Sequence, residues 1–482
     1  MIDLRPVVHI LGWISGLIGA MLFLPAAADA MADNPDWRPF AESGAFALVL
    51  GLSLAIATMR TKPLSLDLRQ AFLVTVLGWI VVAVLGAIPM MGIGIGFVDA
   101  LFEAMSGITT TGSTVIVGLD SLPPGLLLWR AILQWIGGIG IIAIAILILP
   151  LLRVGGMQMF KIESSDVSLE KVSTAVKTIV WLAVIYAALT SLCGALYFVF
   201  GMSGFDAVTH AMTTLSTGGY STHDDSFGHF PQASLHWIAV TFMVLGGLPF
   251  GLYIKELQGK GLSLLSDQQV RGFLIFLFCA GMGLAIWLVD NLGVSFGEAL
   301  TISFFNVVSI VTTTGFASED YGQWGHGPAG FFLVLMFVGG CSGSTSGAIK
   351  IYRFQVLFLF VNAHLKRLFS PNRVIPLRYN GRSLSEDVAM SVLAFLAVFV
   401  ATIAVVTVIL AALGLDLVTA YSASVTAITN VGPGLGPVVG PAGNFAGLPD
   451  AAKLVLTGAM LAGRLEVLAL LVVLSPDFWH YG

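Results

Sequence analysis

Charged residues are scarce in this chain of 482 residues. Only 10% of the residues are Asp, Glu, Lys or Arg, whereas a soluble domain carries about 25%. Three cysteines are present, and they lie far apart in apolar or glycine-rich stretches: Cys193, Cys279 and Cys341. An odd number of cysteines without metal-ligand spacing argues against both a disulfide framework and a zinc site. The chain also lacks a Walker loop and an HExxH motif, and these absences weaken an enzymatic interpretation.

Apolar residues take the place of the missing charge. They make up 57% of the chain, and the mean hydropathy is +0.93. The apolar runs are about twenty residues long, which is the length of a helix that crosses a bilayer, whereas a β-barrel would show alternating segments of about ten residues. The sequence therefore predicts an all-α polytopic membrane protein, with membrane lipid around it and no role for nucleic acid.

Four short stretches that resemble one another organise the sequence. Each contains a glycine in a small, mostly hydroxyl-bearing loop, follows a short apolar run and precedes a long one: 109–113, 215–220, 312–316 and 429–433. We predict their key glycines at Gly112, Gly218, Gly315 and Gly432, and this spacing of roughly one hundred residues indicates an internal repeat. Glycine reaches φ > 0 without strain, so it can turn backbone carbonyls inward. Four such loops around one axis would form rings of carbonyl oxygens, which is how a potassium filter replaces the hydration shell of its ion.

The repeated unit consists of a long apolar run, a short run, the glycine loop and a second long run. The short runs are too short to cross a bilayer, and each is predicted to be a re-entrant half-helix: 97–108, 205–215, 299–311 and 418–428. The long runs are predicted to span the membrane: 71–91, 125–152, 174–200, 233–253, 272–292, 330 to the region of 360, 388–413 and 451–474. Two leading spans, at 7–24 and 46–58, bring the total to ten full spans. The glycine loops are too polar to face lipid, so they are expected to meet on a central, pseudo-fourfold pore axis.

The repeats divide the chain into five predicted units. They are two N-terminal transmembrane helices in 1–65, pore repeat 1 in 66–170, repeat 2 in 171–265, repeat 3 in 266–383 and repeat 4 in 384–482. The first apolar run is followed by three alanines at 26–28, which also resembles a signal peptide with its cleavage site. We expect a retained span because the run is long and its flank carries only Arg5, balanced by Asp3. Partial cleavage within 1–30 stays open as the alternative.

Charge placement predicts the orientation in the membrane. One set of loops is basic, with Arg60, Lys62, Arg69, Arg153, Lys161, Lys171, Lys255, Lys260, Arg271, Lys366, Arg367, Arg373, Arg378 and Arg382. The other set is mainly acidic, with Asp29, Asp33, Asp36, Asp120, Asp224, Asp225, Glu319 and Asp320, and with Arg38 as the basic exception. By the positive-inside rule the basic loops and the N-terminus are cytoplasmic, and the glycine loops lie toward the outer face.

Acidic residues also stand near the start of each short run: Asp99, Asp206, Glu298 and Asp416. A carboxylate near a helix N-terminus is favoured by the helix dipole, so these acids fit either capping or a pore role, and the two are compatible. The opposite, partly negative helix ends would then point at the pore interior, where a cation would wait. His210 lies inside the second short run, while His223 and His229 lie in the outer loop near Asp224 and Asp225. We expect a solvated polar loop there, with a surface metal site as the alternative.

The four loops resemble those of the Trk/Ktr/HKT superfamily of potassium transporters, and the TrkH branch in particular. The matching motifs are TTTGST at 109–114, STGGYS at 216–221, TTTGFA at 312–317 and TNVGPG at 429–434, and the two extra leading spans favour TrkH over the shorter KtrB branch. The resemblance implies a filter with bound K⁺ at Thr110, Thr111, Gly112, Ser216, Thr217, Gly218, Thr313, Thr314, Gly315, Asn430, Val431 and Gly432. In plant relatives a serine at the position of Gly112 goes with sodium preference, so glycine resembles the potassium-permeable pattern.

Two further elements are predicted to lie below the filter. The run 338–348 has four glycines and four hydroxyl side chains in the middle of an apolar span, and glycine disfavours helix by roughly 1 kcal/mol per residue, so we expect the helix to break there. The resemblance implies that this run closes the pore, with the gate residues Gly339, Gly340, Gly343, Ser344, Thr345, Ser346, Gly347 and Arg464. A charge inside a span is by default functional, and the alternative for Arg464 is an ion pair with an acid on a neighbouring span.

These features predict potassium uptake across the bacterial inner membrane through a gated filter, without covalent chemistry or a covalent cofactor. The resemblance implies a homodimer with a cytosolic, nucleotide-binding regulatory subunit like TrkA, so any nucleotide would bind that partner. The basic segment 366–382 is a plausible docking surface for it, or for anionic lipid. A sodium-permeable or proton-coupled carrier is the alternative within transport. A membrane-embedded enzyme is the alternative of a different class, but the spans lack paired His or Asp residues for it.

Overall fold

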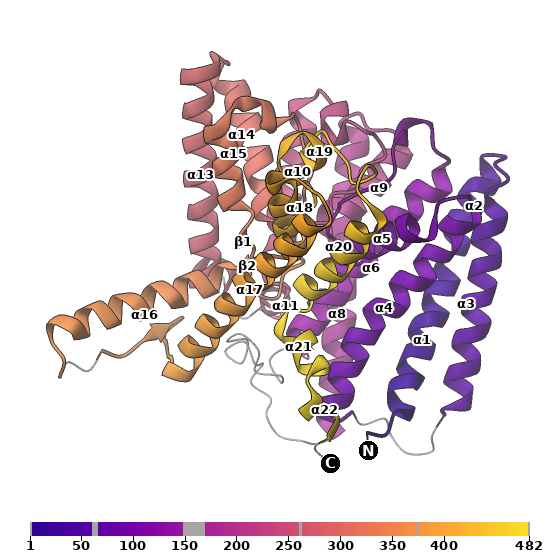
Figure 1. Ribbon diagram of the computed structural model, residues 1–482, viewed down its shortest axis with the longest axis horizontal. Coiled ribbons are helices and arrows are strands. Elements are labelled where there is room, and N and C mark those ends of the chain that lie inside the picture. Colours follow the sequence, from indigo (N-terminus) through magenta and orange to yellow (C-terminus); the bar gives the residue numbers. More distant parts are fainter. Residues whose placement is uncertain (1, 60–65, 148–168, 260–262, 373–374, 481–482) are drawn as a thin grey trace.

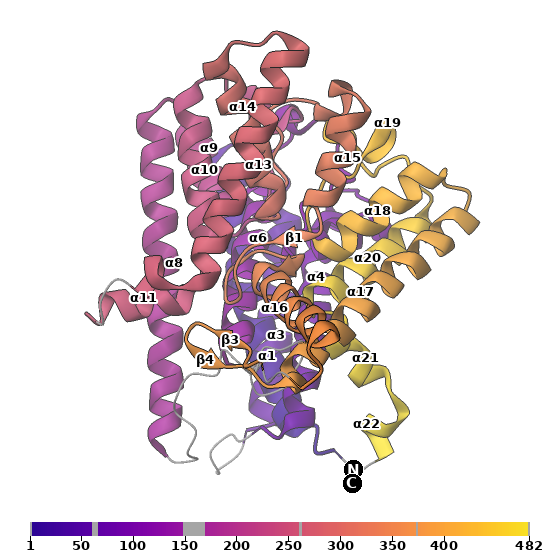
Figure 2. The same ribbon diagram turned by 90° about the vertical axis from the view of Figure 1, so that its left-hand side faces the viewer.

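The chain folds into a bundle of helices, many of which run roughly along the vertical direction of Figure 1. The structure is a computed structural model, and it describes every residue except 1, 60–65, 148–168, 260–262, 373–374 and 481–482. Both chain ends lie at the same end of the bundle, at the bottom of Figures 1 and 2. Several basic residues used above for orientation lie outside the described residues: Arg60, Lys62, Arg153, Lys161, Lys260 and Arg373.

Two leading helical segments pack side by side at one edge of the bundle (right-hand side of Figure 1). Helices α1 (Arg5–Met21) and α2 (Phe23–Met31) run on as one stretch, and α3 (Trp37–Ala57) lies against them. Glycines allow this close approach, because a Cβ atom on Gly51 or on Gly12 would collide with the backbone of the facing helix. Such small-residue contacts are typical of helix pairs in membranes.

Four repeats follow, each with a long helix, a half-helix and a second long or broken helix. Repeat 1 contains α4 (Leu68–Gly92), α5 (Phe97–Ile108), η1 (Leu119–Ser121) and α6 (Pro124–Leu147). Repeat 2 contains α8 (Leu169–Val199), α9 (Gly204–Leu215), η3 (Ser226–His229), α10 (Ala233–Gly247), α11 (Phe250–Leu257) and α12 (Ser263–Ser266). Repeat 3 contains α13 (Gln268–Leu292), α14 (Phe296–Val311), η4 (Tyr321–Trp324), α15 (His326–Leu335), β1 (Val338–Gly339), β2 (Ile349–Lys350), α16 (Ile351–Phe369), β3 (Arg378–Tyr379) and β4 (Arg382–Ser383). Repeat 4 contains α17 (Glu386–Ala412), α18 (Leu417–Thr429), α19 (Gly436–Val439), α20 (Asp450–Arg464), α21 (Leu468–Leu474) and α22 (Pro476–His480).

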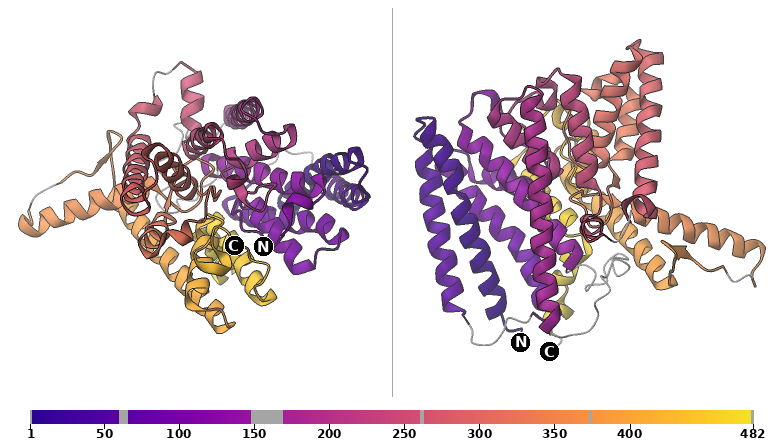
Figure 3. Two further views of the ribbon diagram at one scale, coloured as in Figure 1. Left: turned by 90° about the horizontal axis from the view of Figure 1, so that it is seen from above. Right: turned by 180° about the vertical axis from the view of Figure 1, so that it is seen from behind.

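The repeats succeed one another around a common centre, as the view from above shows (Figure 3, left). Their half-helices α5, α9, α14 and α18 are the short runs predicted from the sequence, and α5 has the predicted bounds. The predicted fold class is confirmed: two leading helices precede four repeats of span, half-helix, loop and span around a pseudo-fourfold pore.

Three of the predicted spans are not straight helices. Among the described residues, seven helical stretches are long and apolar enough to cross a membrane, and two more are bent pairs. The pair α10–α11 bends by 89° because Leu248 precedes Pro249, and a residue before proline is pushed out of the helical region. The pair α20–α21 bends by 109° just after Arg464. The remaining predicted span, the second long run of repeat 3, is interrupted between α15 and α16. The glycine-rich run breaks the helix there, as predicted.

Helix α16 and the β3–β4 hairpin leave the bundle sideways, as Figures 1 and 3 both show. Arg378 and Tyr379 pair with Ser383 and Arg382 in this antiparallel hairpin. Several apolar side chains along α16 are exposed, with Phe369 89% and Phe358 70% exposed. This arm is therefore a surface of the chain that its own bundle does not cover.

Candidate ion-binding site

Each half-helix ends in the same backbone turn. A residue one or two positions after the helix end adopts a left-handed conformation, with φ of 52° at Thr110, 51° at Thr217, 59° at Thr313 and 56° at Asn430. In each case the next N–H donates to the helical carbonyl five residues earlier, as Thr111 does to Ser106 over 2.9 Å. This is the pattern of a Schellman cap. Glycine normally fills the left-handed position, and a β-branched residue there is an outlier, so three threonines store backbone strain at one place.

A second left-handed residue follows two positions later, and here it is always glycine. These glycines are Gly112, Gly219, Gly315 and Gly432, with φ of 87°, 79°, 82° and 106°. The prediction for the second loop is wrong by one residue, because Gly218 does not have a positive φ and Gly219 does. The loops therefore align as Thr110, Thr217, Thr313 and Asn430 at the first left-handed position. Ser216 is equivalent to Thr109, and Gly218 to Thr111.

The four glycines bring the loops together in a closed ring. A Cβ atom added to any of them would come within 3.0 Å of a carbonyl oxygen on the next loop. The contacts run Gly112 to Gly218, Gly219 to Thr314, Gly315 to Val431 and Gly432 to Thr111, so the order around the ring is that of the sequence. The hydroxyl of Ser113 also donates to the Gly432 carbonyl over 2.8 Å. The backbones approach this closely only because no side chain stands between them.

The loop residues are cut off from the surface of the molecule. Thr109 to Thr111, Ser216, Thr217, Thr312 to Thr314 and Asn430 are all fully buried. The carboxyl ends of the four half-helices converge here, and a helix carries a partial negative charge at that end. A buried ring of backbone carbonyls at such a point is suited to a dehydrated cation.

A polar side chain on the half-helix holds the returning strand of each of the first three loops. In repeat 1 this is Glu103, which accepts from the Val115 N–H over 2.9 Å and from the Thr114 hydroxyl over 3.0 Å. Arg130 from α6 pairs with Glu103 at 2.8 Å, and both are buried. The guanidinium of Arg130 lies 4.1 Å above the Tyr220 ring and donates to the Ser221 carbonyl, so this pair joins loops 1 and 2.

His210 and Asn306 occupy the equivalent places in repeats 2 and 3. The separation in sequence from Glu103 to Gly112 recurs from His210 to Gly219 and from Asn306 to Gly315. His210 Nε2 lies 3.0 Å from the Ser221 hydroxyl. The Asn306 amide donates to the Ser318 hydroxyl over 2.8 Å. Sequence reasoning missed these supports, although the equal spacing and the polar residues within apolar runs were visible signals.

Gln134 from α6 supports the second loop directly. Its amide donates to the Gly218 carbonyl over 2.6 Å, and its oxygen accepts from the Tyr220 N–H over 3.0 Å. In the fourth loop, Asn430 donates to the Thr111 hydroxyl over 2.9 Å and to the Met460 carbonyl over 3.0 Å. The four loops therefore share a backbone path but not their supports, and the ring is only pseudo-fourfold.

We expect Gln134→Leu to destabilise the chain by about 1–3 kcal/mol, because a buried carbonyl and a buried N–H would lose their partner at nearly constant side-chain volume. The apparent melting temperature in detergent measures this. Gln323→Leu is the matched control, since Gln323 is exposed and should leave the melting temperature unchanged. Equal melting temperatures for Gln134→Leu and wild type would show that Gln134 does not support the loop.

The glycine-rich run between α15 and α16 lies directly against the ring. Gly347 donates its N–H to the Thr313 hydroxyl over 2.6 Å, and Ala348 donates to the Thr429 carbonyl over 2.8 Å. Thr345 receives a hydrogen bond from the Thr217 hydroxyl over 3.1 Å. This run therefore contacts the second, third and fourth loops at the level of the half-helix ends.

The other half of the run packs against the bend between α10 and α11. Cys341 donates its N–H to the Gly247 carbonyl over 2.9 Å, and the Gly343 carbonyl accepts from the Phe250 N–H over 2.9 Å. The parallel pair β1–β2 closes the run at its base, with Gly339 opposite Lys350. The bend after Leu248 thus supplies backbone partners that a straight helix would not offer.

Arg464 lies beside this run, at the last residue of α20. It is 3% exposed, and among the described residues none of its three guanidinium nitrogens has a hydrogen-bond partner. The alternative of an ion pair with a neighbouring acid has no support in the described part of the chain. The nearest acid in sequence, Glu466, instead pairs with Arg353 of α16.

A small cavity of about 20 Å³ separates Arg464 from the run, which is room for about one water molecule. It is lined by Ile141, Ala145, Gly343, Ser344, Ser346, Gly347, Ala348, Lys350, Gly463, Arg464 and Glu466. The Lys350 ammonium group donates to the Ser346 carbonyl. Two basic side chains, Lys350 and Arg464, therefore line the cavity beside the glycine-rich run.

The acids at the N-terminal ends of the half-helices have distinct local roles. Asp416 is the N-cap of α18, and hydrogen bonds from Thr419 and from the Val418 N–H lower the pKa of its carboxyl group. Asp99 forms an ion pair with Lys453 of α20 at 2.6 Å. Ser203 and Ser295 provide the caps of α9 and α14, with Asp206 and Glu298 in the first turns. Capping is therefore established for Asp416 alone among these four acids.

The chain is similar to known cation transport proteins over almost its full length. The family model described as "TrkH: Cation transport protein" matches residues 38–481. The "Trk system potassium uptake protein TrkI" of Halomonas elongata is 45% identical over 480 residues, covering 98% of this chain and 97% of that protein. The "Trk system potassium uptake protein TrkH" of Salmonella typhimurium is 36% identical over 490 residues, covering 99% of each. The crystal structure of the potassium transporter TrkH from Vibrio parahaemolyticus superposes with a TM-score of 0.92 at 33% identity, covering 99% of this chain and 100% of that one.

Proposed function

Because the chain belongs to the TrkH family of cation transport proteins, we propose that it takes up potassium ions through the ring of four glycine loops. The closed ring carries this proposal. Each loop places a glycine against a carbonyl of the next, and no other arrangement in the described residues brings four backbone segments together at the convergence of four helix ends. The names of the similar proteins, which are potassium uptake proteins, support potassium as the ion. No enzymatic activity is involved.

The filter in this proposal consists of residues Thr110 to Gly112, Thr217 to Gly219, Thr313 to Gly315 and Asn430 to Gly432. This assignment follows the backbone conformation, so in the second loop Gly219 takes the place of Ser216, which was expected from sequence. The carbonyl oxygens replace water around the entering ion, and the partly negative helix ends lower its energy there. Gly112 keeps the first loop free of a side chain at the point where a serine would narrow the ring.

The gate consists of the glycine-rich run and Arg464. The run is held against three loops by a few hydrogen bonds from hydroxyl and backbone groups, which are individually weak, about 0.5–1.5 kcal/mol each. A run joined in this way closes the path below the ring and can withdraw without unfolding a helix. The unpartnered guanidinium of Arg464 adds electrostatic repulsion to a waiting cation.

Cation flux into proteoliposomes that hold this chain alone tests the proposal. We expect uptake of potassium and rubidium in preference to sodium and lithium, independent of an imposed pH gradient. The Gly112→Ser variant should reduce the preference for potassium. Flux that requires a proton gradient would replace the proposal with a proton-coupled carrier, and equal sodium and potassium flux would remove the selectivity assigned to Gly112.

The proposal places the chain in the bacterial inner membrane as a multi-pass protein, with its N-terminus on the cytoplasmic side. The positive-inside rule supports it, and both chain ends lie on the side opposite the outer helix starts (Figure 1). Cysteine labelling by a reagent that does not cross membranes measures it. A cysteine introduced at Asp225 should react in intact cells, and one introduced at Asp3 should react only after the cells are opened.

A homodimer and a cytosolic, TrkA-like regulatory subunit are further parts of the proposal. The sideways arm of α16 supports both, since it exposes apolar side chains and carries Lys366 and Arg367 in its last turn. Any regulating nucleotide would act through that subunit. Light scattering tests the homodimer by measuring the molar mass of the purified chain. A monomer at micromolar concentration would contradict it.

A further inference from the structure

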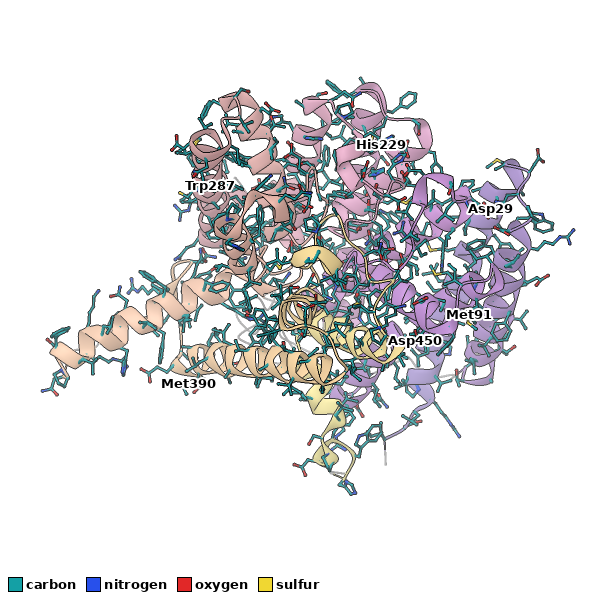
Figure 4. The ribbon with its side chains drawn as sticks, turned by 45° about the horizontal axis from the view of Figure 1, so that its top comes forward. Asp29, Met91, His229, Trp287, Met390 and Asp450 are labelled. Carbon is teal, nitrogen blue, oxygen red and sulfur yellow. The ribbon has the colours of Figure 1, made fainter. Side chains whose placement is uncertain are left out.

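Two histidines and an aspartate meet on the outer side of the ring, although they come from different repeats. Asp120 belongs to η1 of repeat 1, whereas His223 follows the second glycine loop and His229 ends η3. One ligand atom from each of the three side chains lies within 4.8 Å of the other two. His229 lies in the upper part of the bundle, away from the chain ends (Figure 4). The polar loop is exposed at Asp120 and His229, as expected from sequence, and it brings these side chains together with His223.

The cluster is held in place by its neighbours. The Asp224 N–H donates to Asp120 Oδ2 over 3.3 Å, and the Gly118 N–H donates to Asp224 Oδ1 over 3.1 Å, so the two loops are fastened together. His223 Nδ1 is hydrogen-bonded to Asp120 Oδ1, and the His223 side chain is only 16% exposed.

We propose that Asp120, His223 and His229 form a binding site for a divalent transition metal ion of the zinc type. Two imidazole nitrogens and one carboxylate oxygen are the ligands that such ions select, and three protein ligands with an open fourth position are a common zinc arrangement. Magnesium and calcium would need more oxygen ligands than the cluster offers. The His223 and His229 rings are stacked with centroids 3.5 Å apart, and binding tilts them so that both nitrogen lone pairs reach one ion.

A second carboxylate, that of Asp206, lies on the other side of the His223 ring, where it can fix the orientation of that ring. Asp206 Oδ1 lies 3.5 Å from His223 Nε2, on the opposite side of the ring from Asp120. Asp206 is itself fixed by the Thr222 and Ser203 hydroxyls, each at 2.7 Å. A carboxylate that accepts the second N–H of a metal-bound histidine fixes its tautomer and raises its basicity, and its loss typically costs about 10–100-fold in affinity.

Metal binding would join the outer loops of repeats 1 and 2 and place two positive charges near the entrance to the ring. Ser221 connects the cluster to the second glycine loop. Its hydroxyl accepts from the backbone N–H of His223 and also lies within hydrogen-bond distance of His210. A bound ion should therefore slow potassium entry, by repulsion and by restraining these loops. This regulatory part rests on the proposed function, whereas metal binding itself does not.

Zinc binding to the full-length, tag-free chain in detergent tests the site, with a fluorescent zinc chelator as competitor. We expect one zinc ion per chain at pH 7.5. Asp120→Asn and His229→Gln should each weaken binding by more than tenfold, and Asp206→Asn by about tenfold or more. His326→Gln is the matched control, since His326 is an exposed histidine at the start of α15 and should leave binding unchanged.

The variants are chosen so that misfolding does not imitate a lost site. Asp120 is 53% exposed and His229 is also exposed, so unchanged melting temperatures are expected without zinc. Unchanged zinc stoichiometry and affinity in folded Asp120→Asn and His229→Gln would overturn the site. In the flux assay, zinc should slow potassium uptake by wild type and not by His229→Gln. Zinc that binds at this cluster but leaves wild-type flux unchanged would overturn the regulatory part alone, and the binding result stands even if the chain conducts no potassium.

Discussion

Arg464→Ala is expected to increase potassium flux through the chain alone by at least about tenfold. Two unit charges 4 Å apart repel by about 4 kcal/mol at an effective dielectric constant of 20, and about a third of that energy changes a rate tenfold. Arg464 has no hydrogen-bond partner among the described residues, so little of its charge is neutralised locally. Removal of the guanidinium also enlarges the small cavity beneath the glycine-rich run, which gives the run space to withdraw.

Arg464→Lys is the matched variant for this experiment, because it keeps the charge and shortens the side chain. If repulsion closes the path, Arg464→Lys should stay close to wild type while Arg464→Ala leaks. Equal increases in both variants would assign the effect to packing instead of charge. Flux in Arg464→Ala no greater than in wild type, in protein that melts at the same temperature, would contradict a gating role.

Gly219→Ala is expected to reduce potassium flux more than tenfold and to abolish the preference for potassium over sodium. A left-handed conformation costs a residue with a Cβ atom about 1–2 kcal/mol. The added Cβ would also collide with the carbonyl oxygen of Thr314 on the next loop, so that carbonyl or the whole loop must move. Either movement changes the cavity that has to replace the water around the ion.

The neighbouring glycine provides a test of the register as well as of the ring. The three atoms nearest to a Cβ atom on Gly218 all belong to the end of the Gln134 side chain, so we expect a smaller loss for Gly218→Ala than for Gly219→Ala, where the nearest atom is a backbone carbonyl oxygen. Gly204→Ala at the start of α9 is the neutral control, because no atom lies within 4 Å of the added group. A larger effect at Gly218 than at Gly219 would return the second loop to the register first predicted.

The repeat architecture was predictable because it depends on length and hydropathy. A mostly apolar run of twelve residues, as at Phe97–Ile108, cannot span a bilayer, and a polar loop that follows it must be buried or line a cavity. The register of the second loop was missed because Gly218 and Gly219 are adjacent, although the spacing from His210 favours Gly219 and the backbone conformation agrees with it. The bend at Leu248 had a local signal in Pro249. The break after Arg464 had none, since Glu466 and Val467 adopt positive φ only in their tertiary setting.

The polar supports of the ring needed the three-dimensional structure. Glu103 and Arg130 are far apart in sequence, and their pairing across α5 and α6 follows from how the half-helix docks. The position of Arg464 beside the glycine-rich run depends in the same way on the bend between α20 and α21. Gln134 resembles any isolated polar residue in a span until its contact with Gly218 is seen. The cluster of Asp120, His223 and His229 likewise joins two repeats, so no local spacing of ligands could indicate it.

The most direct test of a cation site within the ring is the anomalous scattering of rubidium in crystals of the chain grown with rubidium in place of potassium. The account predicts a peak on the axis between the four loops, surrounded by backbone oxygens and lost in Gly219→Ala. A well-ordered ring without a peak, or rubidium bound only at acidic side chains outside it, would contradict the assignment of the four loops as the filter.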